Sequence, residues 1–126
     1  MTTSTPRELQ QKFLEHFLAS DLEGLLSLYE VSAAFVTQTG ETLMGSEDVR
    51  ASLAGFVGIP RTSFTYTPTF AAETDGVVLM HADWSLEGTD PDGKPLMLGG
   101  TTIEVARRQA GGTWRYAVDS PFGIIS

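Results

Sequence analysis

The chain has 126 residues, 41% of them hydrophobic, which suits one globular domain over residues 1–126 with a flexible start at about 1–5. Its formal net charge of -8 disfavours binding to nucleic-acid phosphates, and its lack of cysteine excludes disulfides and thiolate sites. No stretch approaches the roughly 20 apolar residues of a membrane span. We therefore expect a cytoplasmic protein that binds neither nucleic acid nor membrane.

The first half of the chain opens with a helical pattern. Thr5 can cap a helix, Pro6 suits its first position, and the pattern ends near Ala19. Apolar residues recur along this segment at helical spacing: Leu9, Phe13, Leu14, Phe17 and Leu18. Such a broad stripe is typical of a helix that lies on a core.

Two further helices follow. The second is short and is capped by Ser20 or Asp21. The third is capped by Ser46 and is stopped by Gly58 and Pro60.

Strands are predicted in two parts of the chain: a small hairpin between the second and third helices, and a run from residue 62 onward in which the period changes to two. The expected strands cover residues 33–37, 42–44, 62–70, 77–87, 95–108 and 113–119. Pro68 lacks a donor and belongs at a bulge or an edge, and Gly99-Gly100 marks a bulge or a bend. Helices followed by an antiparallel sheet predict an α+β fold, in which a strongly curved sheet wraps around the three helices and leaves an open mouth where a small ligand binds.

Three parts of the chain resemble a known family. They are the segment Asp21–Tyr29, Gly45 before the third helix, and the ending Trp114–Gly123. Together they resemble the SnoaL-like branch of the nuclear transport factor 2 and ketosteroid isomerase superfamily. The resemblance implies a cone-shaped α+β fold with three N-terminal helices in the concavity of the sheet. The superfamily includes steroid isomerases, polyketide cyclases, dehydratases and ligand-binding proteins, so it does not by itself choose a function.

The steroid isomerase branch fits this sequence poorly. The resemblance places Thr37 where that branch has its carboxylate base, and Phe13 where it has a tyrosine donor. A threonine is no base near neutral pH and phenylalanine has no proton to donate. Only Glu104 matches, as the acid on a late strand. We expect no steroid isomerase of the usual kind.

The polyketide cyclase branch uses an acid on a late strand, and the resemblance makes Asp119 and Glu104 the candidate catalytic residues. Strict alternation with Ile103 and Val105 would turn Glu104 toward solvent or a partner subunit, whereas the resemblance turns it inward. Asp119 could equally accept hydrogen bonds from the C-terminal turn. If both face one apolar cavity, burial and mutual repulsion raise a pKa toward the range that acid-base catalysis needs.

Two histidines are weaker candidates. His81 and Asp83 share the strand face opposite Trp84, where they could form a proton relay, half a metal site, or a polar pair at a subunit interface. In the family this outer face packs against a second subunit, which predicts a homodimer. His16 is most simply a surface residue. No metal-ligand spacing occurs, so we expect no metal and no cofactor.

Seven residues are candidates for the wall of a ligand pocket: Phe13, Phe17, Tyr29, Thr37, Phe56, Tyr66 and Trp84. They could equally fill the interior. One hypothesis is therefore a protein that binds a small, largely apolar molecule and transforms it by cofactor-independent acid-base chemistry of the isomerase or lyase type, with Trp84 and Phe17 stacking on it. The alternative is a non-catalytic association module with a filled cavity.

Overall fold

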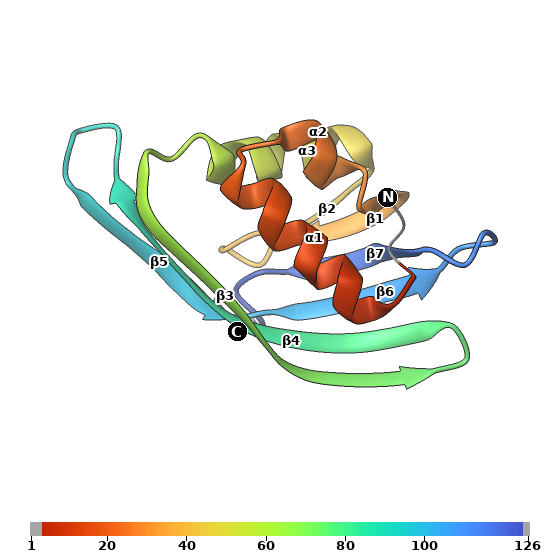
Figure 1. The fold of residues 1–126 in the computed structure, drawn as a ribbon. Helices are drawn as coiled ribbons and strands as arrows, with labels where there is room; N and C mark the ends of the chain where they lie inside the picture. The colour runs from red at the N-terminus through yellow and green to blue at the C-terminus, as the bar shows by residue number, and fades with distance from the viewer. Residues whose placement is uncertain (1–3, 125–126) are drawn as a thin grey trace.

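The computed structural model describes residues 4–124, and the expected flexibility of residues 1–3 lies outside them. Its three helices lie on the concave side of a curved sheet (Figure 1). The helices are α1 (Pro6–Leu18), α2 (Leu22–Leu26) and α3 (Ser46–Val57). The strands are β1 (Tyr29–Val36), β2 (Thr42–Met44), β3 (Arg61–Thr74), β4 (Val77–Thr89), β5 (Pro95–Thr101), β6 (Ile103–Arg108) and β7 (Trp114–Ser120). The predicted α+β fold, with helices in the concavity of the sheet, is confirmed.

The sheet has seven strands in the order β2-β1-β7-β6-β4-β3, and β5 pairs with β4. It is mixed and not wholly antiparallel as predicted, because β1 runs parallel to β7 while every other pair is antiparallel. This parallel pair joins the first long strand of the chain to the last. It therefore brings residues on β1 beside the C-terminal strand.

The structure confirms the predicted N-cap of α1 and corrects the predicted N-cap of α3. The Thr5 side chain accepts the backbone N–H of Glu8 at 3.1 Å, as expected for the first helix. At the start of α3 the N-cap is Gly45 and not Ser46. Gly45 has a φ of 96°, which a glycine adopts without strain, and the Ser46 hydroxyl instead donates to the carbonyl of Val31 at 3.3 Å.

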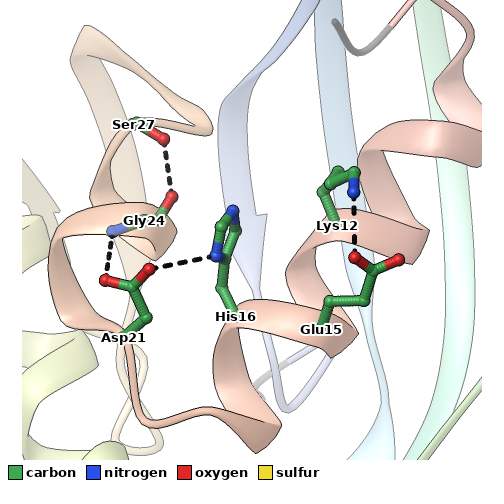
Figure 2. Close-up of polar contacts among 6 residues, drawn as sticks. All are labelled: Lys12, Glu15, His16, Asp21, Gly24 and Ser27. Carbon is green, nitrogen blue, oxygen red and sulfur yellow. Dashed lines mark hydrogen bonds and ion pairs between the residues drawn. The ribbon is translucent and has the colours of Figure 1, made fainter. Parts of the chain in front are cut away.

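The junction of α1 and α2 is a compact polar contact (Figure 2). Asp21 caps α2 by accepting the Gly24 N–H at 2.9 Å, and its other carboxylate oxygen lies 3.3 Å from His16 Nδ1. His16 therefore lies at the junction with 30% of its side chain exposed, and not free on the surface as expected. A Cβ on Gly24 would lie 2.4 Å from His16 Nδ1, so the glycine leaves room for the His16 side chain beside Asp21.

The expected long strand over 95–108 is two strands separated at Thr102. The first half of β4 pairs with β6 and the second half with β5. Where β4 changes its partner strand, the Thr102 N–H donates to the carbonyl of Ala82 at 2.8 Å. Gly99 and Gly100 pair with β4 in regular register, so the bulge that was one of the two predictions for this pair does not occur. Pro68 does lie next to a register shift, on the edge strand β3.

Candidate functional site

A cavity opens between α1, α3 and the concave face of the sheet. Its apolar wall is mostly aromatic: Phe13, Phe17, Phe35, Phe56, Phe64 and Trp84. Its polar side chains are Tyr66, Thr102, Glu104, Tyr116 and Asp119. About 40 Å³ of the cavity is open to the centre of a water-sized sphere, which is room for roughly three water molecules.

Two carboxyl groups enter this cavity from neighbouring strands. Glu104 on β6 and Asp119 on β7 are directly opposite each other in the antiparallel ladder. They are 2% and 6% exposed. Both therefore point inward, as the family resemblance implied, and the outward orientation of Glu104 predicted by alternation was wrong. Alternation failed because β6 carries the larger apolar residues, Ile103 and Val105, on its outer face.

A β-bulge on β7 places a third polar group beside them. Ala106 pairs with Tyr116 and Val105 pairs with Val118, so Ala117 is an extra residue in the ladder. Tyr116 and Asp119 are three residues apart and would face opposite sides of a regular strand. The bulge turns both of them into the cavity.

Glu104 accepts hydrogen bonds from three side chains. The Tyr66 and Thr102 hydroxyls donate to it, each at 2.7 Å, and the Gln10 amide donates at 3.3 Å. Burial raises the pKa of the Glu104 carboxyl, and these hydrogen bonds oppose the rise because they stabilise the ionised form. Three donors on one carboxylate make Glu104 the better place for a negative charge.

Asp119 receives fewer hydrogen bonds than Glu104 does. It accepts one side-chain hydrogen bond, from the Tyr29 hydroxyl at 2.5 Å. Burial and then the charge of Glu104 raise the pKa of Asp119 to about 7, against the lowering effect of the Tyr29 hydrogen bond. Because the two acids are adjacent and the pKa of each is raised, they titrate as a coupled pair, with one titration close to neutral pH.

The Tyr116 hydroxyl makes no hydrogen bond of normal geometry within residues 4–124, although the residue is 1% exposed. It nevertheless acts as a hydrogen-bonding neighbour of Glu104 and of Tyr66, and lowers the pKa of each. A buried hydroxyl without a partner is uncommon, because its desolvation is not repaid. The Tyr116 hydroxyl is therefore assigned to the polar cluster around Glu104.

The structure places the seven predicted pocket residues differently from one another. Five line the cavity: Phe13, Phe17, Phe56, Tyr66 and Trp84. Tyr29 meets the site through its hydroxyl on Asp119. Thr37 lines a second, outer hollow of about 190 Å³ that also includes Phe35 and Phe56. Phe56 therefore contributes to both hollows.

The Trp84 ring is fixed in the cavity wall. Its indole N–H donates to the backbone carbonyl of Pro121 at 2.6 Å. Phe56 meets it edge-on, with ring centroids 5.9 Å apart. Only the ring surface of Trp84 is thus left for a ligand.

Three site residues were not foreseen: Gln10, Thr102 and Tyr116. Gln10 occurs at helical spacing before Phe13 and Phe17, so a polar residue on an apolar stripe was the available signal. Thr102 stands two residues before Glu104 and shares its face. Tyr116 gave no such signal, because the bulge that turns it inward is not visible in the hydrophobic pattern.

The histidine candidates lie outside the cavity. His81 is on the opposite face of β4, where its Nδ1 is 2.6 Å from the carbonyl oxygen of Thr102. Asp83 accepts the hydroxyl of Thr101 at 2.7 Å. Within residues 4–124 there is no cluster of three or more His, Asp or Glu side chains arranged to hold a metal ion. No helix in that range is long and apolar enough to cross a membrane.

Comparison with known proteins identifies the family. The model of the SnoaL-like domain matches residues 11–116. The chain belongs to the SnoaL-like domain family. No protein of curated function matches it by sequence.

Solved structures share the fold of this SnoaL-like domain at low sequence identity. A ketosteroid isomerase-like protein from Erwinia carotovora atroseptica is 12% identical with a TM-score of 0.81, over 94% of this chain and 92% of that one. A proposed SnoaL-like polyketide cyclase from Shewanella denitrificans is 15% identical with a TM-score of 0.68, over 94% and 90%. A proposed calcium/calmodulin-dependent protein kinase II association domain from Thiobacillus denitrificans is 19% identical with a TM-score of 0.73, over 94% and 95%.

Proposed function

We propose that this SnoaL-like domain binds a small, uncharged, largely apolar molecule in its cavity and moves a proton on it without a cofactor. The observation that carries the proposal is the pair of buried carboxyls, Glu104 and Asp119, that share one aromatic-walled cavity. A pKa of about 7 on Asp119 suits a group that both takes and returns a proton near neutral pH.

The two acids have different roles in this proposal. Glu104 stays ionised, because three donors stabilise its charge. Asp119 in its ionised form takes a proton from a carbon next to a carbonyl group, and in its protonated form returns it to the product. The Tyr29 hydroxyl keeps the Asp119 side chain in place by donating to it throughout.

The cavity also limits what can bind. Among residues 4–124, no Lys, Arg or His lines it, so the charge of Glu104 repels anionic ligands. Phe35 and Phe56 line both the cavity and the outer hollow, and Phe56 is half-buried. A ligand larger than a few water molecules enters when the Phe56 ring turns away, and it then lies against Trp84 and Phe17.

Hydrogen exchange on a simple ketone tests the reaction directly. Wild-type protein in D₂O should speed deuterium incorporation at the methyl group of acetophenone, followed by NMR, with a rate that rises as pH increases through about 7. Asp119→Asn should lose about 10²-fold or more of this acceleration. Asp83→Asn, which removes an exposed carboxylate from the outer face, should keep it. Equal rates for wild type and Asp119→Asn would contradict the proposal.

A second candidate function, subunit association, has an observation of its own. Six apolar residues form one continuous row across the outer face of the sheet, each opposite the next in the ladder: Ala72, Leu79, Val105, Val118, Ala34 and Met44. Leu79 is 40% exposed and Met44 64%. We propose that a second copy of the chain covers this row in a two-fold symmetric dimer. The association-domain name of one structural neighbour supports this reading.

A further inference from the structure

We propose that His81, on the outer face of the sheet, is a positioning residue for the cavity acid Glu104, and that it acts through Thr102. This inference rests on the proposed function, in which Glu104 has to be ionised. It adds to that function a residue that lies outside the cavity and on the opposite side of the sheet.

Thr102 lies where the ladder along β4 departs from its regular pattern. The register of β4 and β5 places Ala82 opposite Thr102. The Thr102 N–H donates to the Ala82 carbonyl at 2.8 Å, and in a regular ladder the Ala82 N–H would donate back to the Thr102 carbonyl. Here that N–H donates to the Thr102 side chain instead, at 2.9 Å to Oγ1.

This exchange fixes the direction of the Thr102 hydroxyl. A hydroxyl has one proton to donate and lone pairs that accept. Its oxygen accepts the Ala82 N–H, and its proton goes to Oε2 of Glu104 at 2.7 Å. Ala82 and Thr102 are 0% and 4% exposed, so water does not compete for these bonds. The Thr102 hydroxyl is thus held as a donor to Glu104, where it lowers the pKa of the carboxyl.

The same exchange leaves the Thr102 carbonyl without the Ala82 N–H. His81 supplies a donor from the outer face, since its Nδ1 lies 2.6 Å from the carbonyl oxygen. A carbonyl oxygen can only accept, so Nδ1 carries a proton. This nitrogen keeps its proton both in the charged ring and in the neutral form that donates here, so the bond does not depend on the charge of His81.

The His81 ring is held in place on the outer face. His81 is half-buried, and the Phe70 ring, opposite it on β3, lies against it with ring centroids 5.3 Å apart. The charged side chains along this face have other partners: Asp83 accepts a threonine hydroxyl of β5, and Arg107 pairs with Glu30. His81 is therefore the side chain that satisfies the Thr102 carbonyl.

Removing the His81 donor should undo this arrangement. The Thr102 carbonyl would become a buried acceptor without a donor, which is costly. The donor that a regular ladder would give it is the Ala82 N–H. Once that N–H returns to the carbonyl, the Thr102 hydroxyl is no longer held toward Glu104. The Glu104 carboxylate then loses part of the stabilisation of its charge.

NMR of the side-chain carboxyl carbons in the Asp119→Asn protein tests the inference. In this parent protein Glu104 titrates without its acidic neighbour, and Tyr66 and Tyr116 stay neutral because burial raises the pKa of each. Two uncharged changes of similar size are then compared. His81→Leu removes the donor, whereas His81→Asn keeps an N–H donor at the position of Nδ1.

We expect the Glu104 signal to titrate at a higher pH in His81→Leu than in the parent protein, and at the parent's pH in His81→Asn. Thr102→Val removes the hydroxyl itself and should shift the Glu104 titration further in the same direction, while Thr102→Ser should leave it unchanged. A side chain that only stabilised the outer face would alter unfolding and leave this titration where it is.

Two results would overturn the inference. One is an equal Glu104 titration in His81→Leu and His81→Asn, since these variants differ in the donor. The other is a shift to lower pH in His81→Leu. The measurement uses no ligand, so it is separate from the exchange experiment on acetophenone. If the titrations behave as expected and wild type does not speed that exchange, the positioning role of His81 stands while the proposed function fails.

Discussion

At the scale of single residues, the site depends on an unequal division of hydrogen bonds between two acids. Glu104 receives three side-chain donors and Asp119 receives one. Each donor stabilises negative charge, which favours ionisation of Glu104 over that of Asp119. In the proposed mechanism this inequality makes Glu104 the anion and Asp119 the group that changes its charge.

This inequality predicts how stability depends on pH. Folding raises the pKa of Asp119 from 3.8 to about 7, so the folded state holds a proton that the unfolded state has released between these pH values. Asp119 therefore stabilises the fold most at low pH, and this contribution is lost as pH rises toward 7, by at most about 1.4 kcal/mol per pH unit.

Asp119→Asn should remove this dependence. From pH 5 to pH 8 the free energy of unfolding of wild type, measured in urea, should fall relative to that of the variant. Asp48→Asn changes an exposed carboxylate in the first turn of α3, and its free energy of unfolding should change with pH as that of wild type does. A constant difference between wild type and Asp119→Asn across this range would show that Asp119 titrates normally.

At the scale of elements, the β4–β5 hairpin depends on one close approach of two backbones. A Cβ on Gly99 would lie 2.7 Å from the carbonyl oxygen of Trp84 and 3.4 Å from the Cα of Ser85. Both are backbone atoms within a regular ladder, so neither can give way easily. The glycine holds β5 against the strand that carries Trp84 into the cavity wall.

Gly99→Ala should accordingly destabilise the protein by roughly 1–3 kcal/mol, measured by urea unfolding. Gly55→Ala is the matched control. A Cβ on Gly55, in the interior of α3, meets nothing within 4 Å, so this change should stabilise the protein by about 1 kcal/mol through helix propensity. If Gly99→Ala is as stable as wild type, the hairpin is more adaptable than its geometry implies.

At the scale of the whole molecule, one sheet offers two apolar faces. The concave face meets the helices and forms the core and the cavity, while the outer face carries the apolar row from Ala72 to Met44. A monomer would leave that row in water. The row and the cavity use opposite sides of the same strands, so a dimer would leave the site in place.

Replacing the central residue of the row tests the dimer. Leu79→Glu should convert a dimeric wild type into a monomer in size-exclusion chromatography with light scattering, because the interface would have to bury a charge. Leu18→Glu is the control: it changes a leucine that is 53% exposed at the end of α1 and should leave the mass unchanged. A wild type that is already monomeric at high concentration would contradict the dimer.

The sequence by itself determined the three helices, the order of the elements and the strands, except for the division of residues 95–108 into β5 and β6. Caps, turns and hydrophobic periods are local properties, so Thr5 and Asp21 marked helix starts and the switch to a period of two marked the strands. The alternation along β4 also gave the buried face of Trp84 correctly, since that strand is regular. The family resemblance supplied the inward orientation of Glu104, which periodicity alone had reversed.

The tertiary structure alone decided which groups meet. Glu104 and Asp119 face each other because of the β6–β7 register, and Tyr116 joins them because Ala117 is an extra residue in that ladder. Gln10 reaches Glu104 across 94 residues of sequence. Registers, bulges and such distant contacts depend on how separate elements pack, and a local pattern does not contain that information.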